Sequence, residues 1–248
     1  MDSKYHEKLI VSSAHHMVTP TDTGKIMGTV LIELIPAFAV GIYQYGYRAD
    51  LLTALSVVAC VVVEFLYNKP TKIPQTVGDL SAVVTGVLPA FNLPSGLPYW
   101  MAVVGSFFAI VIVKQLFGGL GCNLVNPAVT ARIFMFIAFA TEMTTWPTAR
   151  GASDVSGAVI DSVTSATPLG QLSNGDGTLA SVDYSNLDLF LGNVGGCIGE
   201  VSALALAIGG LFLIWRKVIS PIIPLSFIAT VFVLGLIWGG FDGPVFHI

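Results

Sequence analysis

Four carboxylates stand within or at the ends of long apolar runs: Glu33 in LIELIP, Glu64 in VVVEFL, Asp79, and Glu200 in GGCIGEVSALALAIGG. A charge in apolar surroundings is costly, and such residues often serve ion or proton pathways. Glu64 and Asp79 lie near the ends of their runs, from which their side chains can reach water. Glu33 and Glu200 are the candidates for an ion path. For Glu200, which stands among small residues that permit close helix packing, a hydrogen-bonded packing role is equally open.

A second chemical signal is the run FGGLGCNLVNPAVTARIF at 117–134, in which glycines and a proline interrupt an apolar stretch. Asn123 and Asn126 are three residues apart, a spacing that places both on one face if the segment is helical. Irregular backbone at membrane depth survives only inside protein or beside a cavity. Two interpretations are open: a tight turn capped by the asparagines, or a polar pocket for a small planar or ionic ligand.

The longest polar stretch, 141–194, is rich in Ser, Thr, Asp, Asn and Gly and contains SVTSATPLG at 162–170, just after Asp161. Connections this long within a compact protein are usually functional or disordered. A solvated loop without chemistry is the alternative interpretation of this region.

The elements that position these residues follow from composition. Of the 248 residues, 54% are hydrophobic and 10% are charged, against about 25% charged in soluble domains. This composition predicts an all-α integral membrane protein: a polytopic helix bundle with a broken Gly-rich segment at 117–128 and one long extracytoplasmic loop. At about 20 apolar residues per crossing, the expected spans are 26–45, 51–67, 77–93, 97–117, 128–140, 195–215 and 219–238.

The positive charges predict the orientation, because lysine and arginine favour the cytoplasmic side. With a cytoplasmic N-terminal segment at 1–25, nine positive residues, Lys114 and Arg132 among them, fall inside and only Arg48 and Arg150 fall outside. This leaves helices 1–5 at 26–140, an extracytoplasmic loop at 141–194, and helices 6 and 7 at 195–248. The three cysteines are expected to be buried thiols, the N-terminal histidines to lie in a solvated segment, and the lack of a basic cluster argues against nucleic acid.

Two motifs together resemble the NqrB/RnfD family, whose members are membrane subunits of ion-translocating electron-transfer complexes. DSVTSATPL at 161–169 is similar to the family's flavinylation motif, Asp, two variable residues, Ser or Thr, usually Gly, Ala, then Thr. Ser165 stands where glycine is common, which is the one departure. GGLGCNLVNPA at 118–128 resembles the family's Gly-Gly-x-Gly-x-Asn-x-x-Asn-Pro-Ala element, and GEVSALALAIGG from Gly199 resembles a third. The resemblance covers nearly the whole chain.

The resemblance implies that Thr167 carries FMN through a phosphoester to its side-chain oxygen. A threonine hydroxyl is a poor nucleophile unaided, so a separate flavin transferase would activate it and recognise Asp161, Thr164, Ser165 and Ala166. The resemblance also implies that Asn123 and Asn126 help to hold a noncovalent riboflavin. The flavins would carry the redox chemistry, so neither a catalytic side chain nor a metal site is expected.

The short N-terminal segment favours an RnfD-like subunit, which passes electrons between ferredoxin and NAD with Na⁺ or H⁺ translocation, over an NqrB-like subunit of a Na⁺-pumping quinone reductase. Expected partners are the other membrane and peripheral subunits of an Rnf complex and membrane lipid, in a prokaryotic inner membrane. Family members continue past a Pro-Val-aromatic-His segment, so C-terminal helices are expected to be missing after 248. A channel or secondary transporter and a passive scaffold are the competing hypotheses.

Overall fold

The computed structural model describes residues 22–71, 75–147, 167 and 185–239. Within these ranges the elements are helices, in agreement with the expected all-α bundle. Their bounds are α1 Thr23–Tyr45, α2 Tyr47–Thr71, η2 Val77–Asp79, α3 Ser81–Phe91, α4 Tyr99–Phe107, η3 Phe108–Gln115, α5 Pro127–Ala138, α6 Ala140–Met143, α8 Asn186–Leu191, α9 Ala203–Trp215 and α10 Ile222–Gly239.

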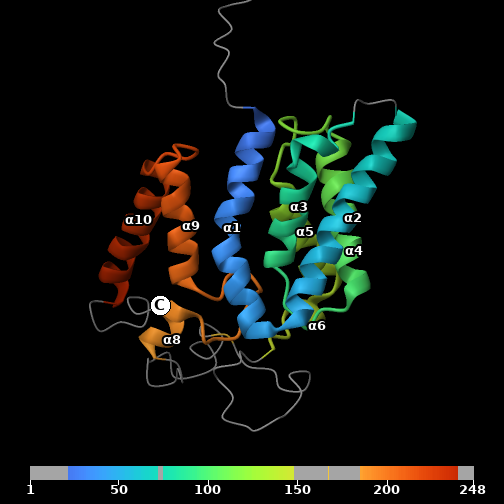
Figure 1. Ribbon diagram of the computed structural model, residues 1–248. Coiled ribbons are helices and arrows are strands. Elements are labelled where there is room, and N and C mark those ends of the chain that lie inside the picture. Colours follow the sequence, from blue (N-terminus) through green and yellow to red (C-terminus); the bar gives the residue numbers. More distant parts are fainter. Residues whose placement is uncertain (1–21, 72–74, 148–166, 168–184, 240–248) are drawn as a thin grey trace, which may run out of the picture.

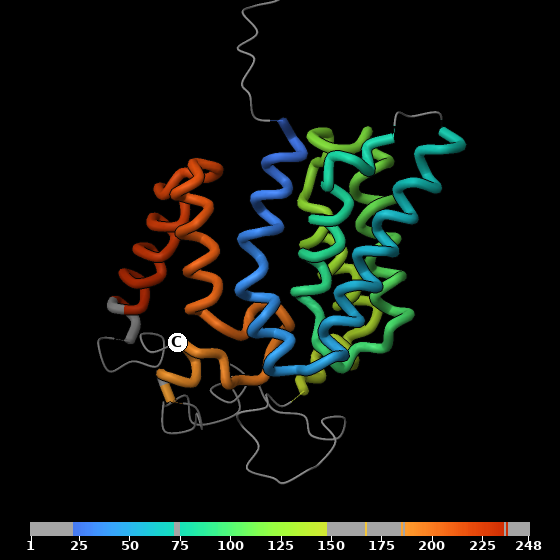
Figure 2. The backbone as a smooth tube through the Cα atoms, in the orientation of Figure 1, coloured from blue at the N-terminus to red at the C-terminus, as the bar shows by residue number. Residues whose placement is uncertain are grey.

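The long helices stand side by side, with α1 in the middle, α2 to α5 on one side of it, and α9 and α10 on the other (Figures 1 and 2). We call the end of the bundle at which α1 begins and α2 ends the upper end, as drawn in Figure 1, and the opposite end the lower end. The short helices α6 and α8 lie at the lower end. The two segments that flank the long polar region therefore meet at the same end of the bundle.

α1 and α2 are each long and apolar enough to cross a bilayer, with 23 and 25 residues. The Asp22 side chain caps α1 by accepting a hydrogen bond from the Thr23 N–H at 2.8 Å. The helix ends at Gly46, whose φ of 70° lies in the left-handed region that glycine adopts without strain. Because α2 begins at the next residue, the chain reverses direction there with almost no loop.

The helix that follows α4 changes its winding before it reaches the upper end. Residues Phe108–Gln115 form the π-helical segment η3. The Leu116 N–H donates to the Val111 carbonyl at 3.0 Å, and the Gly119 N–H donates to the Lys114 carbonyl at 3.0 Å, so both bonds span five residues. Such segments are rare and often occur at functional sites.

The sixth expected span is shorter than predicted. Helix α9 begins at Ala203, not at Gly195, and the eleven residues before it are not α-helical. Residues 192–202 instead form an inserted segment that lies largely buried against α1 and the α3–α4 turn. The Ile198 N–H donates to the Leu93 carbonyl at 3.2 Å, and the Gly199 N–H donates to the Phe91 carbonyl at 2.9 Å. These bonds satisfy backbone groups that an apolar interior would otherwise leave unpaired.

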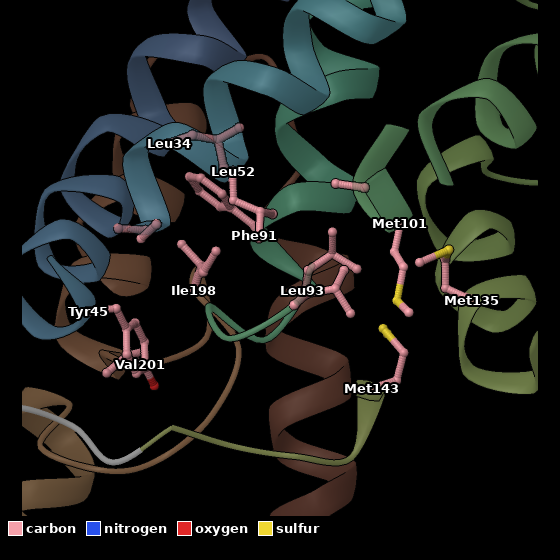
Figure 3. Packing of buried hydrophobic residues seen from close by; sticks show 14 of the residues in the cluster. Leu34, Tyr45, Leu52, Phe91, Leu93, Met101, Met135, Met143, Ile198 and Val201 are labelled. Atoms are coloured by element: carbon pink, nitrogen blue, oxygen red, sulfur yellow. The ribbon is translucent and has the colours of Figure 1, made fainter. Parts of the chain in front are cut away.

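The apolar core joins the inserted segment to the helices around it. Figure 3 shows Ile198 between Phe91 and Tyr45, and the side chains of Met101 and Met143 lie in the same cluster. The outer faces of the helices carry many exposed large apolar side chains, especially on α10. Such a surface would be a liability in water and suits the hydrocarbon of a bilayer.

Candidate functional site

Thr167 is half-buried and lies outside the helices. Asp161, Thr164, Ser165 and Ala166 lie outside the described residues. The predicted flavinylation motif is therefore described only at the residue proposed to bear the flavin.

The end of the long polar region is fixed to the last turn of α1. The Gln44 amide donates to the Asn193 side-chain oxygen at 2.9 Å, and the Asn193 amide donates to Asp188 at 3.2 Å. The Tyr45 hydroxyl accepts from the Gly196 N–H at 2.9 Å and donates to the Gly196 carbonyl at 3.0 Å. Ser185 and Asp188 form a capping box at the start of α8. The chain leaving the loop is thus held firmly at the lower end.

The Gly-rich segment between η3 and α5 lies at the upper end and is not helical. Gly118, Gly119 and Gly121 have φ values of 108°, 89° and 84°. Because Asn123 and Asn126 both precede α5, the expectation that they share one helix face is wrong.

The two asparagines have different surroundings. The Asn126 side chain caps α5, since its oxygen accepts from the Ala128 N–H at 2.9 Å and from the Val129 N–H at 3.4 Å. The side-chain oxygen of half-buried Asn123 is buried without a hydrogen-bond partner in the described part of the chain. A buried acceptor of this kind calls for an explanation, and a bound polar ligand is one.

Glu200 belongs to a polar cluster that the sequence did not predict. It lies in a turn of the inserted segment rather than inside a helix, which corrects the expected position. Arg132 stands halfway along α5, not near its end, and donates to Glu200 at 3.2 Å and to the Asn92 side-chain oxygen at 2.8 Å. The guanidinium also lies 3.7 Å from the Cys197 sulfur. Side-chain exposure is 36% for Arg132 and 54% for Glu200, so the pair is accessible from outside the chain.

Glu33 lies where α1 and α9 approach closely. A Cβ atom at Gly209 would come within 2.6 Å of the Glu33 carbonyl oxygen and 3.0 Å of the side-chain Oε1. Glycine at this position therefore permits the contact between the two helices. Glu33 and Glu200 are carried by different segments, and the described part of the chain does not bring them to a common partner.

The expectation that Glu64 reaches water is wrong. Its side chain is 0% exposed and forms an ion pair with Lys114 at 2.7 Å. Lys114, counted above among the cytoplasmic charges, is itself buried on η3. The two residues stand 50 positions apart, so no local pattern joins them, although each lies inside an apolar run, in VVVEFL and in VIVKQLF. Asp79 does lie near the upper end, where its side chain accepts from the Ser81 N–H at 2.8 Å.

Comparison with known proteins gives consistent relatives. The pattern of the NQR2, RnfD, RnfE family matches residues 10–248. The chain is 46% identical over 242 residues to the component designated D of the Na⁺-translocating ferredoxin:NAD⁺ oxidoreductase complex of Acetobacterium woodii, a match that covers 96% of this chain and 72% of the relative.

Two further relatives agree. The chain is 37% identical to the component designated D of the proton-translocating ferredoxin:NAD⁺ oxidoreductase complex of Clostridium ljungdahlii, covering 96% of this chain and 73% of the relative. It is also 37% identical to the corresponding component of the ion-translocating oxidoreductase complex of Rhodobacter capsulatus, covering 94% and 72%. The helical bundle, the family pattern and these relatives agree that the chain belongs to the NQR2, RnfD, RnfE family.

Proposed function

We propose that this chain is a membrane subunit of an Rnf-type complex, carries FMN on Thr167, and passes electrons between ferredoxin and NAD with translocation of Na⁺ or H⁺. The observation that carries the flavin assignment is the run Asp161 to Thr167, which has the family's motif apart from Ser165. The relatives named above are components of ferredoxin:NAD⁺ or ion-translocating oxidoreductases, which favours the Rnf type over a quinone reductase.

The lower end of the bundle is proposed to face away from the cytoplasm. Lys25 at the start of α1, Lys69 near the end of α2, and Arg216 and Lys217 after α9 gather at the upper end. The buried Lys114 and the intramembrane Arg132 no longer count toward this bias, yet the remaining charges give the same direction. The long polar region, whose flanks meet at the lower end, is then extracytoplasmic, where a membrane-bound or secreted flavin transferase reaches it.

The residues present fit the proposed cofactors by their chemistry. The Thr167 hydroxyl can be esterified by a phosphate, and the anchored segment after the loop holds the chain against α1. At the upper end, the unpartnered side-chain oxygen of Asn123 offers an acceptor to an N–H group such as those of a flavin ring. Asn126 supports this site indirectly, by fixing the start of α5. We keep Asn123 as the riboflavin contact and assign Asn126 a positioning role.

Bound flavins supply the electron transfer in this proposal. The chain positions them: Thr167 fixes one by a covalent bond, and Asn123 orients the other. Glu200 and Glu33 are proposed to contribute negative charge along the ion path, with Arg132 holding the Glu200 carboxylate. Other subunits of the complex and lipid would cover the exposed apolar faces.

The Thr167 assignment is tested in the intact complex from a host that has the transferase. We expect the wild-type chain to keep flavin fluorescence after denaturing electrophoresis, and its Thr167 peptide to be heavier by one FMN less one water. Thr167→Ala removes both signals, whereas Ser162→Ala, at a variable position of the same motif, keeps them. A wild-type peptide of unmodified mass contradicts the proposal.

A further inference from the structure

A buried polar site at the upper end of the bundle is not explained by the flavin chemistry. The Lys114 ammonium donates to Glu64 at 2.7 Å and to the Ser81 hydroxyl at 2.7 Å. The Thr76 hydroxyl donates to the other Glu64 oxygen, and the Asn68 amide donates to Thr76 at 3.3 Å. Four segments of the chain, α2, the residues before η2, the start of α3 and η3, thus meet at one carboxylate.

This ion pair is hard to explain as a stabilising device. Glu64 and Lys114 side chains are 0% and 2% exposed. Removing two charges from water costs about as much as their attraction returns, and apolar replacements of buried pairs are often neutral or stabilising. The chain nevertheless uses a rare π-helical winding, η3, around Lys114. The pair is therefore better explained by a function that needs a charge at this position.

One atom of the site lacks a partner. The Asn68 side chain is 1% exposed, and its carbonyl oxygen has no hydrogen-bond partner among the described residues. Asn68 stands one helical turn after Glu64 on α2, so the two side chains share a face. Its amide already faces Thr76. The carboxamide oxygen is thus an unused acceptor beside the carboxylate, as expected where a cation or a water is to be received.

The ligand set defines the chemical class. The Glu64 carboxylate, the Thr76 and Ser81 hydroxyls and the Asn68 carbonyl are hard oxygen ligands, the type that alkali and alkaline-earth ions prefer. The site holds a single carboxylate, and the described part of the chain has no group of three or more His, Cys, Asp or Glu side chains placed to bind a metal ion. One negative charge balances one positive charge, which Lys114 now provides, so the matching free ligand is a monovalent cation.

We propose that Glu64, Thr76, Ser81 and Asn68 form a monovalent-cation site in which the Lys114 ammonium and a free Na⁺-like cation are alternative occupants. The structure holds the lysine-occupied state. Exchange keeps the net charge of the site constant, so neither occupant leaves a bare carboxylate in the interior. A role in ion translocation rests on the function proposed above, whereas cation binding itself does not.

The test removes the tethered occupant. In the complex purified in detergent, Lys114→Met leaves the Glu64 carboxylate without a counterion, and we expect NaCl to raise the Tm of the chain by roughly 3 °C or more over choline chloride at equal ionic strength. Lys69→Met, which removes an exposed lysine from the same end of α2, should respond like the wild type. Glu64→Gln combined with Lys114→Met should abolish the extra sodium response.

Several results would overturn the proposal. Equal Tm values in sodium and choline for Lys114→Met would do so, including the case in which Glu64 takes up a proton and stability depends on pH alone. An extra sodium response that survives in the double variant would do so too. If Lys114→Met fails to assemble in choline, its recovery in sodium supports the site, and failure in both salts contradicts it. All these readouts are independent of flavin, so loss of the Thr167 adduct would not affect them.

Discussion

Gly209→Ala offers a sharp test of the α1–α9 contact beside Glu33. The new Cβ would lie 2.6 Å from the Glu33 carbonyl oxygen, and 3.0 Å from both Cγ and Oε1 of its side chain. The side-chain atoms can turn away, but the backbone oxygen cannot. The two helices must therefore separate by several tenths of an ångström, and overpacking of this kind costs about 1–3 kcal/mol.

The neighbouring residue provides the control. A Cβ at Gly210 would meet nothing within 4 Å. Both substitutions gain the same preference of alanine for helix, about 1 kcal/mol, so the difference between them isolates the cost of overpacking. At about 2–4 °C per kcal/mol for a chain of this size, Gly209→Ala should melt at least roughly 2 °C below Gly210→Ala. Thermal unfolding of the two purified variants measures this, and equal Tm values would refute the close approach of α9 to Glu33.

Three further predictions concern the polar residues of the proposed function. Glu200→Gln should lower ion transport in vesicles more than electron transfer, while stability changes by only about 0–1 kcal/mol because its pair with Arg132 is exposed; equal loss of both activities would remove the reason to single Glu200 out. Asn126→Ala should cost about 1 kcal/mol of stability through the lost helix cap, and Asn126→Asp should not, as thermal unfolding would reveal; the same Tm for both variants would count against the cap. Asn123→Ala should leave stability unchanged, since its oxygen has no partner in the described structure, but should lower the riboflavin released on denaturation relative to the flavin bound at Thr167; unchanged riboflavin would exclude Asn123 as a contact.

The sequence predicts well what depends on long apolar runs. α1 and α2 lie within a few residues of the expected spans, because 20 or more apolar residues leave the backbone little choice but a helix in a bilayer. The sixth expected span is wrong because hydropathy does not distinguish an apolar helix from a buried irregular segment. Residues 192–202 are apolar and rich in glycine, yet their backbone partners are the carbonyls of Phe91 and Leu93, about a hundred positions away.

The polar residues are harder to predict than the helices, for a related reason. A buried charge and a charge at a membrane surface look alike when only neighbours in sequence are considered. Sequence alone places Lys114 at the surface and Glu64 in reach of water, because the pairing that buries them is tertiary. The capping role of Asn126 is one of the two roles that the sequence leaves open, since Asn before Pro is a frequent helix start. The position of Arg132 escapes prediction because its partners, Asn92 and Glu200, lie on distant segments.

The bonds between the inserted segment and the α3–α4 turn have a consequence for biosynthesis. Phe91 and Leu93 leave the ribosome about a hundred residues before Ile198 and Gly199, which supply the N–H donors for their carbonyls. Until then those carbonyls need water or another temporary donor, so the lower part of the early helices stays hydrated. The first half of the bundle therefore finishes maturing only when the nascent chain has passed residue 202, and Gly199, where a Cβ would strike the Phe91 ring at 2.5 Å, is the position at which a substitution would block that late closure.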